Sequence, residues 1–233
     1  MQATIFFDID GTLIDVKHAQ NKAGETLYSY YGFSQKTNLK SFLEKWNSLT
    51  ESIYNLYTNG QCTYFEQRQM RIRELFRYYK MPLLQSETEI YNRYLSTFEK
   101  NWLCYLDVVP CLQQLAGYNL AVITNGDEQQ QTAKLQKNGL MPFFSDIVCA
   151  NSYGCAKPSL QLFNIAMERS NTTAELCVNV GDTLDTDIKP LGKLGIIGVL
   201  IDRKAKGIKK EEGYYRIGSL EYLPILLQQL FEE

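Results

Sequence analysis

The stretch FFDIDGTLID places two aspartates, Asp8 and Asp10, directly after an apolar run and close to a glycine. Two carboxylates this close repel each other at low dielectric constant if both are ionised. Glycine permits the sharp turn that would end a buried strand at this point. Such a pair can bind a cation, or one carboxyl group can stay charged and the other protonated, so that similar acids do different work.

Three further clusters of polar side chains lie where an apolar run ends or a helical stretch begins. They are Thr124 and Asn125 in VITNGD, Lys157 in AKPS, and Asp182, Asp185 and Asp187 in VGDTLDTD. Such positions converge on one edge of a parallel sheet. Gathered carboxylates raise one another's pKa unless a cation is present, and Mg²⁺ prefers oxygen ligands and usually keeps waters that a phosphate-bearing substrate can share. The carboxylates therefore predict Mg²⁺, and the lysine predicts an anion.

Short apolar runs predict the strands that would position these clusters. The runs are TIFF at 4–7, LAVI at 120–123, DIVC at 146–149, LCVNV at 176–180 and GVLI at 198–201. Amphipathic helical stretches lie between the later runs, at 127–139 and 159–170. This alternation of strand and helix predicts an α/β fold with a mostly parallel sheet and helices on both faces.

A long interval separates the first run from the second and is filled by helical patterns punctuated by glycine and proline. We expect a helical domain of about four helices at residues 16–102, inserted into a core domain made of residues 1–15 and 103–233. Arginines crowd one of the predicted helices, which we interpret as a solvated face. They are Arg68, Arg71, Arg73 and Arg77.

The composition is that of an ordinary globular protein, with 233 residues, 45% hydrophobic and 21% charged residues, and a formal net charge of -2. This charge gives no indication of a nucleic acid polymer as partner. The run RKAKGIKKEE, residues 203–212, balances basic with acidic residues and is expected to be a solvated loop. Six cysteines without a CxxC pair predict free thiols. No apolar run approaches the roughly 20 residues of a membrane span, and no leader precedes Asp8, so the cytoplasm is the expected location.

The four motifs DIDGT, ITNG, AKP and GDTLDTD together resemble, in order and spacing, the haloacid dehalogenase superfamily of phosphohydrolases. The resemblance covers residues 1–15 and about 105–205, and the insertion is similar to the caps of phosphatases of the phosphoglycolate phosphatase type. It implies a Rossmann-like three-layer core with a small α-helical cap. The core motifs are most similar to phosphatases of nucleoside 5'-monophosphates and acylneuraminate 9-phosphates.

This resemblance implies a Mg²⁺-dependent phosphatase in which Asp8 is the nucleophile and forms an aspartyl-phosphate. Asp10 is then protonated at first, gives its proton to the leaving group, and takes a proton from water in the second step. Mg²⁺ would be held by Asp8, the backbone carbonyl of Asp10 and Asp182. The dehalogenases of the superfamily lack an acid at the position of Asp10, so its presence favours phosphoryl transfer.

The remaining polar residues take supporting roles by the same resemblance. Thr124, the backbone amide of Asn125 and Lys157 would hold the transferring phosphoryl oxygens. Asp187 would orient Lys157 or a metal-bound water. Asp185 is interpreted either as a contact to metal-bound water or as a cap for the following turn.

Two alternative functions remain open. A sugar phosphomutase uses the same two aspartates but returns the phosphoryl group to the substrate, and an inactive protein would keep the fold for binding or regulation. The expected partner is a small phosphorylated metabolite, either a nucleotide or a sugar phosphate, and not a membrane. The sequence indicates neither which metabolite it is nor the oligomeric state.

Overall fold

The structure is a computed structural model that describes residues 2–231, and the chain divides into two compact units. One unit comprises Met1–Asp15 with Leu103–Glu233, and the other is Val16–Trp102. We call the first the core unit and the second the helical unit. Their roles as a catalytic domain and a cap domain stay a prediction.

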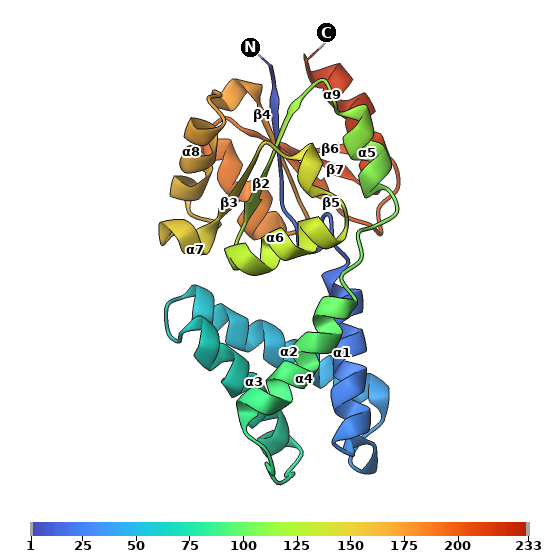
Figure 1. The fold of residues 1–233 in the computed structure, drawn as a ribbon. Coiled ribbons are helices and arrows are strands. Elements are labelled where there is room, and N and C mark those ends of the chain that lie inside the picture. Colours follow the sequence, from blue (N-terminus) through green and yellow to red (C-terminus); the bar gives the residue numbers. More distant parts are fainter. Residues whose placement is uncertain (1, 232–233) are drawn as a thin grey trace. The chain divides into compact units, whose positions relative to one another are not determined.

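The core unit contains a seven-stranded sheet in the order β3-β2-β1-β4-β5-β7-β6 (Figure 1). The strands are β1 (Thr4–Phe7), β2 (Asn119–Thr124), β3 (Asp146–Cys149), β4 (Cys177–Gly181), β5 (Ile197–Ile201), β6 (Ile208–Glu211) and β7 (Tyr214–Ile217). All pairings among strands β1 to β5 are parallel, and β5 also pairs with β7 in parallel. Only β6 runs antiparallel to its neighbour, β7. The predicted mostly parallel sheet is confirmed, as are its five predicted strands.

The segment 203–212 differs from the predicted solvated loop. Ile208–Glu211 forms the edge strand β6, because a turn at Gly213 brings it back onto β7. Arg203 also lies within the fold, since its guanidinium donates to Asp107 Oδ2 at 2.9 Å and to the carbonyl of Thr12 at 2.8 Å. The loop prediction is therefore wrong for this strand and for Arg203.

Helices cover both faces of the sheet. They are α5 (Val108–Gln114), α6 (Glu128–Lys137), α7 (Ala150–Tyr153), α8 (Leu160–Arg169) and α9 (Leu223–Phe231). Figure 1 shows α8 on one side of the sheet and α5 and α9 on the other. Phe163 of α8 packs in a buried cluster with Phe6 and Ile123 of the central strands. The three-layer α/β architecture agrees with the sequence prediction.

Helix α6 begins where its sequence favours a start. The Asp127 side chain accepts a hydrogen bond from the backbone amide of Gln130 at 3.1 Å, which satisfies one free amide of the first turn. The helix ends before Gly139, whose φ of 66° is a left-handed conformation that glycine adopts without strain. These two ends fix the position of α6 directly after β2.

The helical unit consists of α1 (Val16–Tyr30), α2 (Leu39–Thr58), α3 (Tyr64–Tyr78) and α4 (Glu87–Lys100). Reciprocal capping boxes begin α3 at Thr63 and α4 at Ser86. Its interior is aromatic, with Trp46 and Tyr94 in edge contact at 4.9 Å between ring centroids. No helix among residues 2–231 is both long and apolar enough to cross a membrane.

The arginines of α3 do not share one solvated face as the sequence predicted. Arg73 and Arg77 are exposed, but Arg71 is only 7% exposed. Arg71 lies four residues after the buried Gln67 on α3 and therefore on the same buried face of this helix. The prediction is therefore wrong for Arg71.

Candidate active site

The candidate site lies at the carboxyl edge of the sheet, where the three central strands end together. Phe7 of β1 is level with Val122 of β2 and Val180 of β4. The amide of Asp8 donates to the carbonyl of Val180 at 2.9 Å, so this aspartate is held to the end of β4. The register therefore brings the predicted clusters onto one edge of the sheet.

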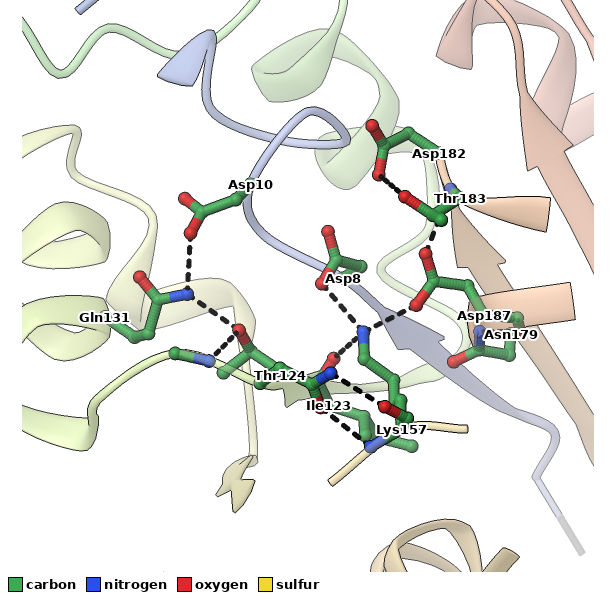
Figure 2. Close-up of polar contacts among 12 residues, drawn as sticks. Asp8, Asp10, Ile123, Thr124, Gln131, Lys157, Asn179, Asp182, Thr183 and Asp187 are labelled. Atoms are coloured by element: carbon green, nitrogen blue, oxygen red, sulfur yellow. Dashed lines mark hydrogen bonds and ion pairs between the residues drawn. The ribbon is translucent and has the colours of Figure 1, made fainter. Parts of the chain in front are cut away.

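Lys157 is the centre of the site. Its Nζ lies 2.7 Å from Asp8 Oδ1 and 2.7 Å from Asp187 Oδ1, and it also donates to the carbonyl of Ile123 at 2.9 Å (Figure 2). Burial opposes the charged ammonium, but the two carboxylates outweigh it and raise the pKa of Lys157. The lysine therefore stays charged although it is only 5% exposed.

The side chain of Asn125 holds the segment that carries Lys157. Its Oδ1 accepts from the amide of Lys157 at 2.7 Å, and its Nδ2 donates to the carbonyl of Lys157 at 2.9 Å. This two-point contact joins the end of β2 to the loop before α8. The sequence assigned only the backbone amide of Asn125 a role, so the side-chain contact is an addition.

Asp8, Asp182 and Asp187 form a carboxylate cluster in which one oxygen of each lies within 4.8 Å of the others. Burial raises the pKa of Asp8 to about 7; Lys157 opposes this shift, while Asp187 and Asp182 add to it. Withdrawal from water, followed by the charge of Asp187, raises the pKa of Asp182 to about 6. The cluster thus holds more negative charge than its own residues neutralise.

The cluster fits a hard divalent cation. When ionised, its three carboxylates carry three negative charges and Lys157 one positive charge, which leaves the two that a divalent ion balances. All of the side-chain ligands offered are oxygens, the donor type that Mg²⁺ prefers. Asp8 and Asp182 were predicted as ligands, and Asp187, which was predicted to orient Lys157 or a metal-bound water, lies in the same cluster and contacts Lys157.

Gly11 makes room for Asp182 beside the loop that follows Asp8. A Cβ added to Gly11 would lie 2.2 Å from Asp182 Oδ2, and the φ of Gly11 is 94°. Both the space and the backbone conformation therefore require glycine.

We expect Gly11→Ala to weaken Mg²⁺ binding by about 10-fold or more, because Asp182 must move away from the other carboxylates. The measurement is a Mg²⁺ titration followed by calorimetry. Gly139→Ala is the matched control, since Gly139 has a φ of 66° but nothing within 4 Å of an added Cβ. Equal Mg²⁺ affinities of the two variants would contradict the assignment of Asp182 to the cation site.

Asp10 lies apart from the carboxylate cluster and contacts helix α6. Lys134 Nζ lies 2.6 Å from its Oδ1 and 2.8 Å from its Oδ2, and Gln131 Nε2 donates to Oδ2 at 3.2 Å. Gln131 Nε2 also donates to Thr124 Oγ1 at 2.7 Å, which joins Asp10 to the end of β2 (Figure 2). Both partners of Asp10 are hydrogen-bond donors, so its two carboxylate oxygens act as acceptors in these contacts.

Gln131 and Lys134 are site residues that the sequence analysis missed. They are spaced by three on α6 and are almost completely buried, at 0% and 1% exposure. Their spacing places them on one helix face, but glutamine and lysine at such positions are typical of a solvated face. The only signal of these two site residues in the sequence was the polar face of the helix that follows VITNGD.

The turn after β4 separates its acidic residues. Asp187 is held by the amide of Thr183, which donates to its Oδ2 at 3.0 Å, and by Asn179, whose Nδ2 donates to its backbone carbonyl at 2.9 Å. Asp185 points instead to the surface, where it pairs with Lys189 at 2.7 Å and is 77% exposed. The structure therefore brings Asp187 into the site and leaves Asp185 outside it.

Comparison with known proteins gives a family match over most of the chain. The model of a family described as haloacid dehalogenase-like hydrolase matches residues 2–195. The chain is 38% identical over 116 residues to the glyceraldehyde 3-phosphate phosphatase of Methanocaldococcus jannaschii, a match that covers 49% of the chain and 51% of that relative. The chain thus spans about half the length of this relative.

Two other matches extend over nearly the whole chain. The N-acylneuraminate-9-phosphatase of Rattus norvegicus is 25% identical over 239 residues, covering 97% of the chain and 94% of the relative. The crystal structure of the HAD-hydrolase YfnB from Bacillus subtilis bound to magnesium has a TM-score of 0.82 at 24% identity, covering 97% of the chain and 99% of that protein. The structural match shows a shared fold.

Proposed function

The chain belongs to the haloacid dehalogenase-like hydrolases, and from this premise we propose that it is a Mg²⁺-dependent phosphatase that hydrolyses a small phosphomonoester. The observation that carries the proposal is the buried ammonium of Lys157, which lies 2.7 Å from Asp8 beside a cluster of carboxylates. A nucleophile, an anion-binding cation and ligands for a metal ion are thereby joined at one edge of the sheet. Relatives named as phosphatases of glyceraldehyde 3-phosphate and N-acylneuraminate 9-phosphate support a sugar phosphate as substrate, and nucleotides remain candidates.

Asp8 attacks the phosphorus atom in the first displacement. Its carboxylate oxygen forms a bond to phosphorus while the bond from phosphorus to the leaving oxygen breaks, which gives an aspartyl-phosphate. Asp10 enters this step protonated and donates its proton to the leaving oxygen, because an alkoxide is a poor leaving group. The released product is an alcohol.

Asp10 acts as a base in the second displacement. A water molecule attacks the phosphorus of the aspartyl-phosphate and gives its proton to Asp10, while the bond to Asp8 breaks and phosphate is released. Lys134 and Gln131 stabilise ionised Asp10 for this step by donating to its carboxylate. They also hold the carboxylate in place against α6.

The phosphoryl oxygens are bound by donors at the ends of β2 and before α8. We assign them to Thr124, the backbone amide of Asn125 and the ammonium of Lys157, because charge spreads over these oxygens in the transition state. Asp187 orients Lys157 through their 2.7 Å contact. Thr124 is itself oriented by Gln131.

Mg²⁺ fits the carboxylates of Asp8 and Asp182, with Asp187 beside them and the backbone carbonyl of Asp10 as a further ligand. The ion would reduce the repulsion between the carboxylate of Asp8 and an anionic phosphate group. These residues recognise only the phosphoryl group, so the choice among phosphomonoesters must come from other residues. We assign the catalytic domain to the core unit and the cap domain to the helical unit.

Lys134→Met is expected to lower kcat by about 10-fold or more with little change in KM, because Lys134 contacts Asp10, to which we assign the proton transfers. Steady-state kinetics with a small phosphomonoester measure both constants. A raised KM with unchanged kcat would mean that Lys134 binds substrate directly.

The proposed activity is tested by release of inorganic phosphate from an aryl phosphate in the presence of Mg²⁺. The proposal predicts turnover that stops when the metal is chelated. Absence of turnover on aryl, sugar and nucleoside phosphates would favour an inactive binding protein. Conversion of a sugar phosphate into its isomer without free phosphate would identify a phosphomutase.

A further inference from the structure

Arg71 is a buried cation of the helical unit that lacks a counter-charge. It lies on α3 and is 7% exposed. No ion pair and no hydrogen bond joins its guanidinium to any other of residues 2–231, and its Nε is buried without a partner. The guanidinium carbon lies 6.0 Å from the centre of the Tyr54 ring, which is a weak contact.

The other arginines of α3 all have polar partners. Arg68 donates to the hydroxyl of Tyr64 at 2.5 Å, Arg73 pairs with Glu87 at 3.0 Å, and Arg77 pairs with Glu74. Arg68 is half-buried and Arg73 and Arg77 are exposed, and each of the three reaches a polar partner. The Nε of Arg68 is also buried without a partner, but Arg71 is the arginine of α3 whose whole guanidinium lacks a hydrogen bond or ion pair among residues 2–231.

Two more buried polar groups accompany Arg71. Gln67 lies one turn earlier on the same face of α3 and is 2% exposed, and its Oε1 has no partner. Thr50 lies on α2 one turn before Tyr54 and is 6% exposed, and its Oγ1 also has no partner. Buried polar atoms are nearly always hydrogen-bonded, so these groups on two adjacent helices leave hydrogen-bonding capacity that a polar ligand can use.

A buried charge without a partner destabilises a folded protein. Such a charge is retained where a ligand supplies the missing counter-charge, and the planar guanidinium binds carboxylate and phosphate groups through two parallel hydrogen bonds. The Nε2 group of Gln67 and the hydroxyl of Thr50 are donors of the kind that an oxyanion accepts, whereas Gln67 Oε1 can only accept.

We propose that Arg71, with Gln67 and Thr50, forms an oxyanion-binding site in the helical unit for a carboxylate or phosphate group of a small molecule. The oxyanion belongs to a small molecule that binds within the helical unit.

The first experiment measures binding of malonate, a dicarboxylate without phosphorus, to the full chain by calorimetry in the presence of Mg²⁺. We expect Arg71→Met to weaken binding by about 10-fold or more, because a charge-assisted pair of hydrogen bonds is lost. Arg73→Met is the matched control on the same helix and should bind as the wild type does. Lys157→Met should bind malonate as the wild type does, because Lys157 lies in the core unit and the proposed site lies in the helical unit.

Malonate binding that depends on Arg71 supports the site even if no phosphomonoester is turned over. Malonate binding that does not depend on Arg71 shows that the site is wrong, whether or not the protein is a phosphatase.

Thermal unfolding separates a binding role from a structural one. Without ligand, Arg71→Met is expected to raise Tm by about 2 to 4 °C, because the variant removes a buried charge that has no partner and keeps much of the side-chain volume. A drop in Tm of that size or more would show that Arg71 supports the packing of the helical unit, and it would contradict the proposed role.

Discussion

Asp8→Asn is expected to lower the turnover of any phosphomonoester by about 10⁴-fold or more while the fold persists. Asparagine has the shape of aspartate and can still accept the hydrogen bond from Lys157 through its Oδ1, as Asp8 does at 2.7 Å. Its backbone amide can still donate to Val180. The amide side chain, however, is a far weaker nucleophile towards phosphorus than a carboxylate.

Phosphate release measures this loss, and circular dichroism with thermal unfolding checks that the fold is kept. Asp185→Asn is the matched control, because Asp185 belongs to the same acidic sequence motif as Asp182 but lies at the surface, paired with Lys189. It should turn over at the wild-type rate. Near-normal rates in Asp8→Asn would remove the assignment of the nucleophile.

Lys157→Met is expected to have the second-largest effect, and it should change both activity and stability. We expect kcat/KM to fall by about 10³-fold or more, because the only cation in contact with Asp8 among the described residues is lost. Without Mg²⁺ the free energy of unfolding should fall by about 3 kcal/mol, since Asp8 and Asp187 are left buried without a counter-charge.

Mg²⁺ should restore part of this stability, because a divalent ion supplies positive charge to the same carboxylates. Urea unfolding with and without Mg²⁺ measures the difference. Lys189→Met removes an exposed lysine paired with Asp185 and should leave stability unchanged. A loss in Lys157→Met that is equally large with and without Mg²⁺ would contradict a shared cluster of charges.

The strands of the core could be predicted because burial on both faces requires continuous apolar runs. TIFF and DIVC match β1 and β3 residue for residue. Strands β6 and β7 could not be found in this way, because IKKE and YYRI are not continuous apolar runs. Strand β6 lies at the edge of the sheet with exposed lysines, and β7 carries Arg216, which pairs with Asp202 and Glu211.

The polar residues at strand ends could be predicted because each follows an apolar run, and the sheet brings Asp8, Lys157 and Asp187 into direct contact. Buried polar residues in helices gave no comparable signal. Lys134 pairs with Asp10, which lies 124 residues away in the chain, and the sequence does not show that pairing. Arg71 was assigned to solvent for the same reason, since a charged residue on a polar helix is typical of an exposed face.

In the proposed mechanism, Asp8 carries the phosphoryl group between the two displacements. This role is tested by stopping the Mg²⁺-dependent reaction with acid during turnover and finding the modified residue by peptide mass spectrometry. We expect one phosphoryl group on the peptide that contains Asp8, located at Asp8 itself and absent from the Asp8→Asn variant. A phosphoryl group on another residue, or rapid phosphate release with no covalent phosphoryl group on the protein, would overturn this role of Asp8.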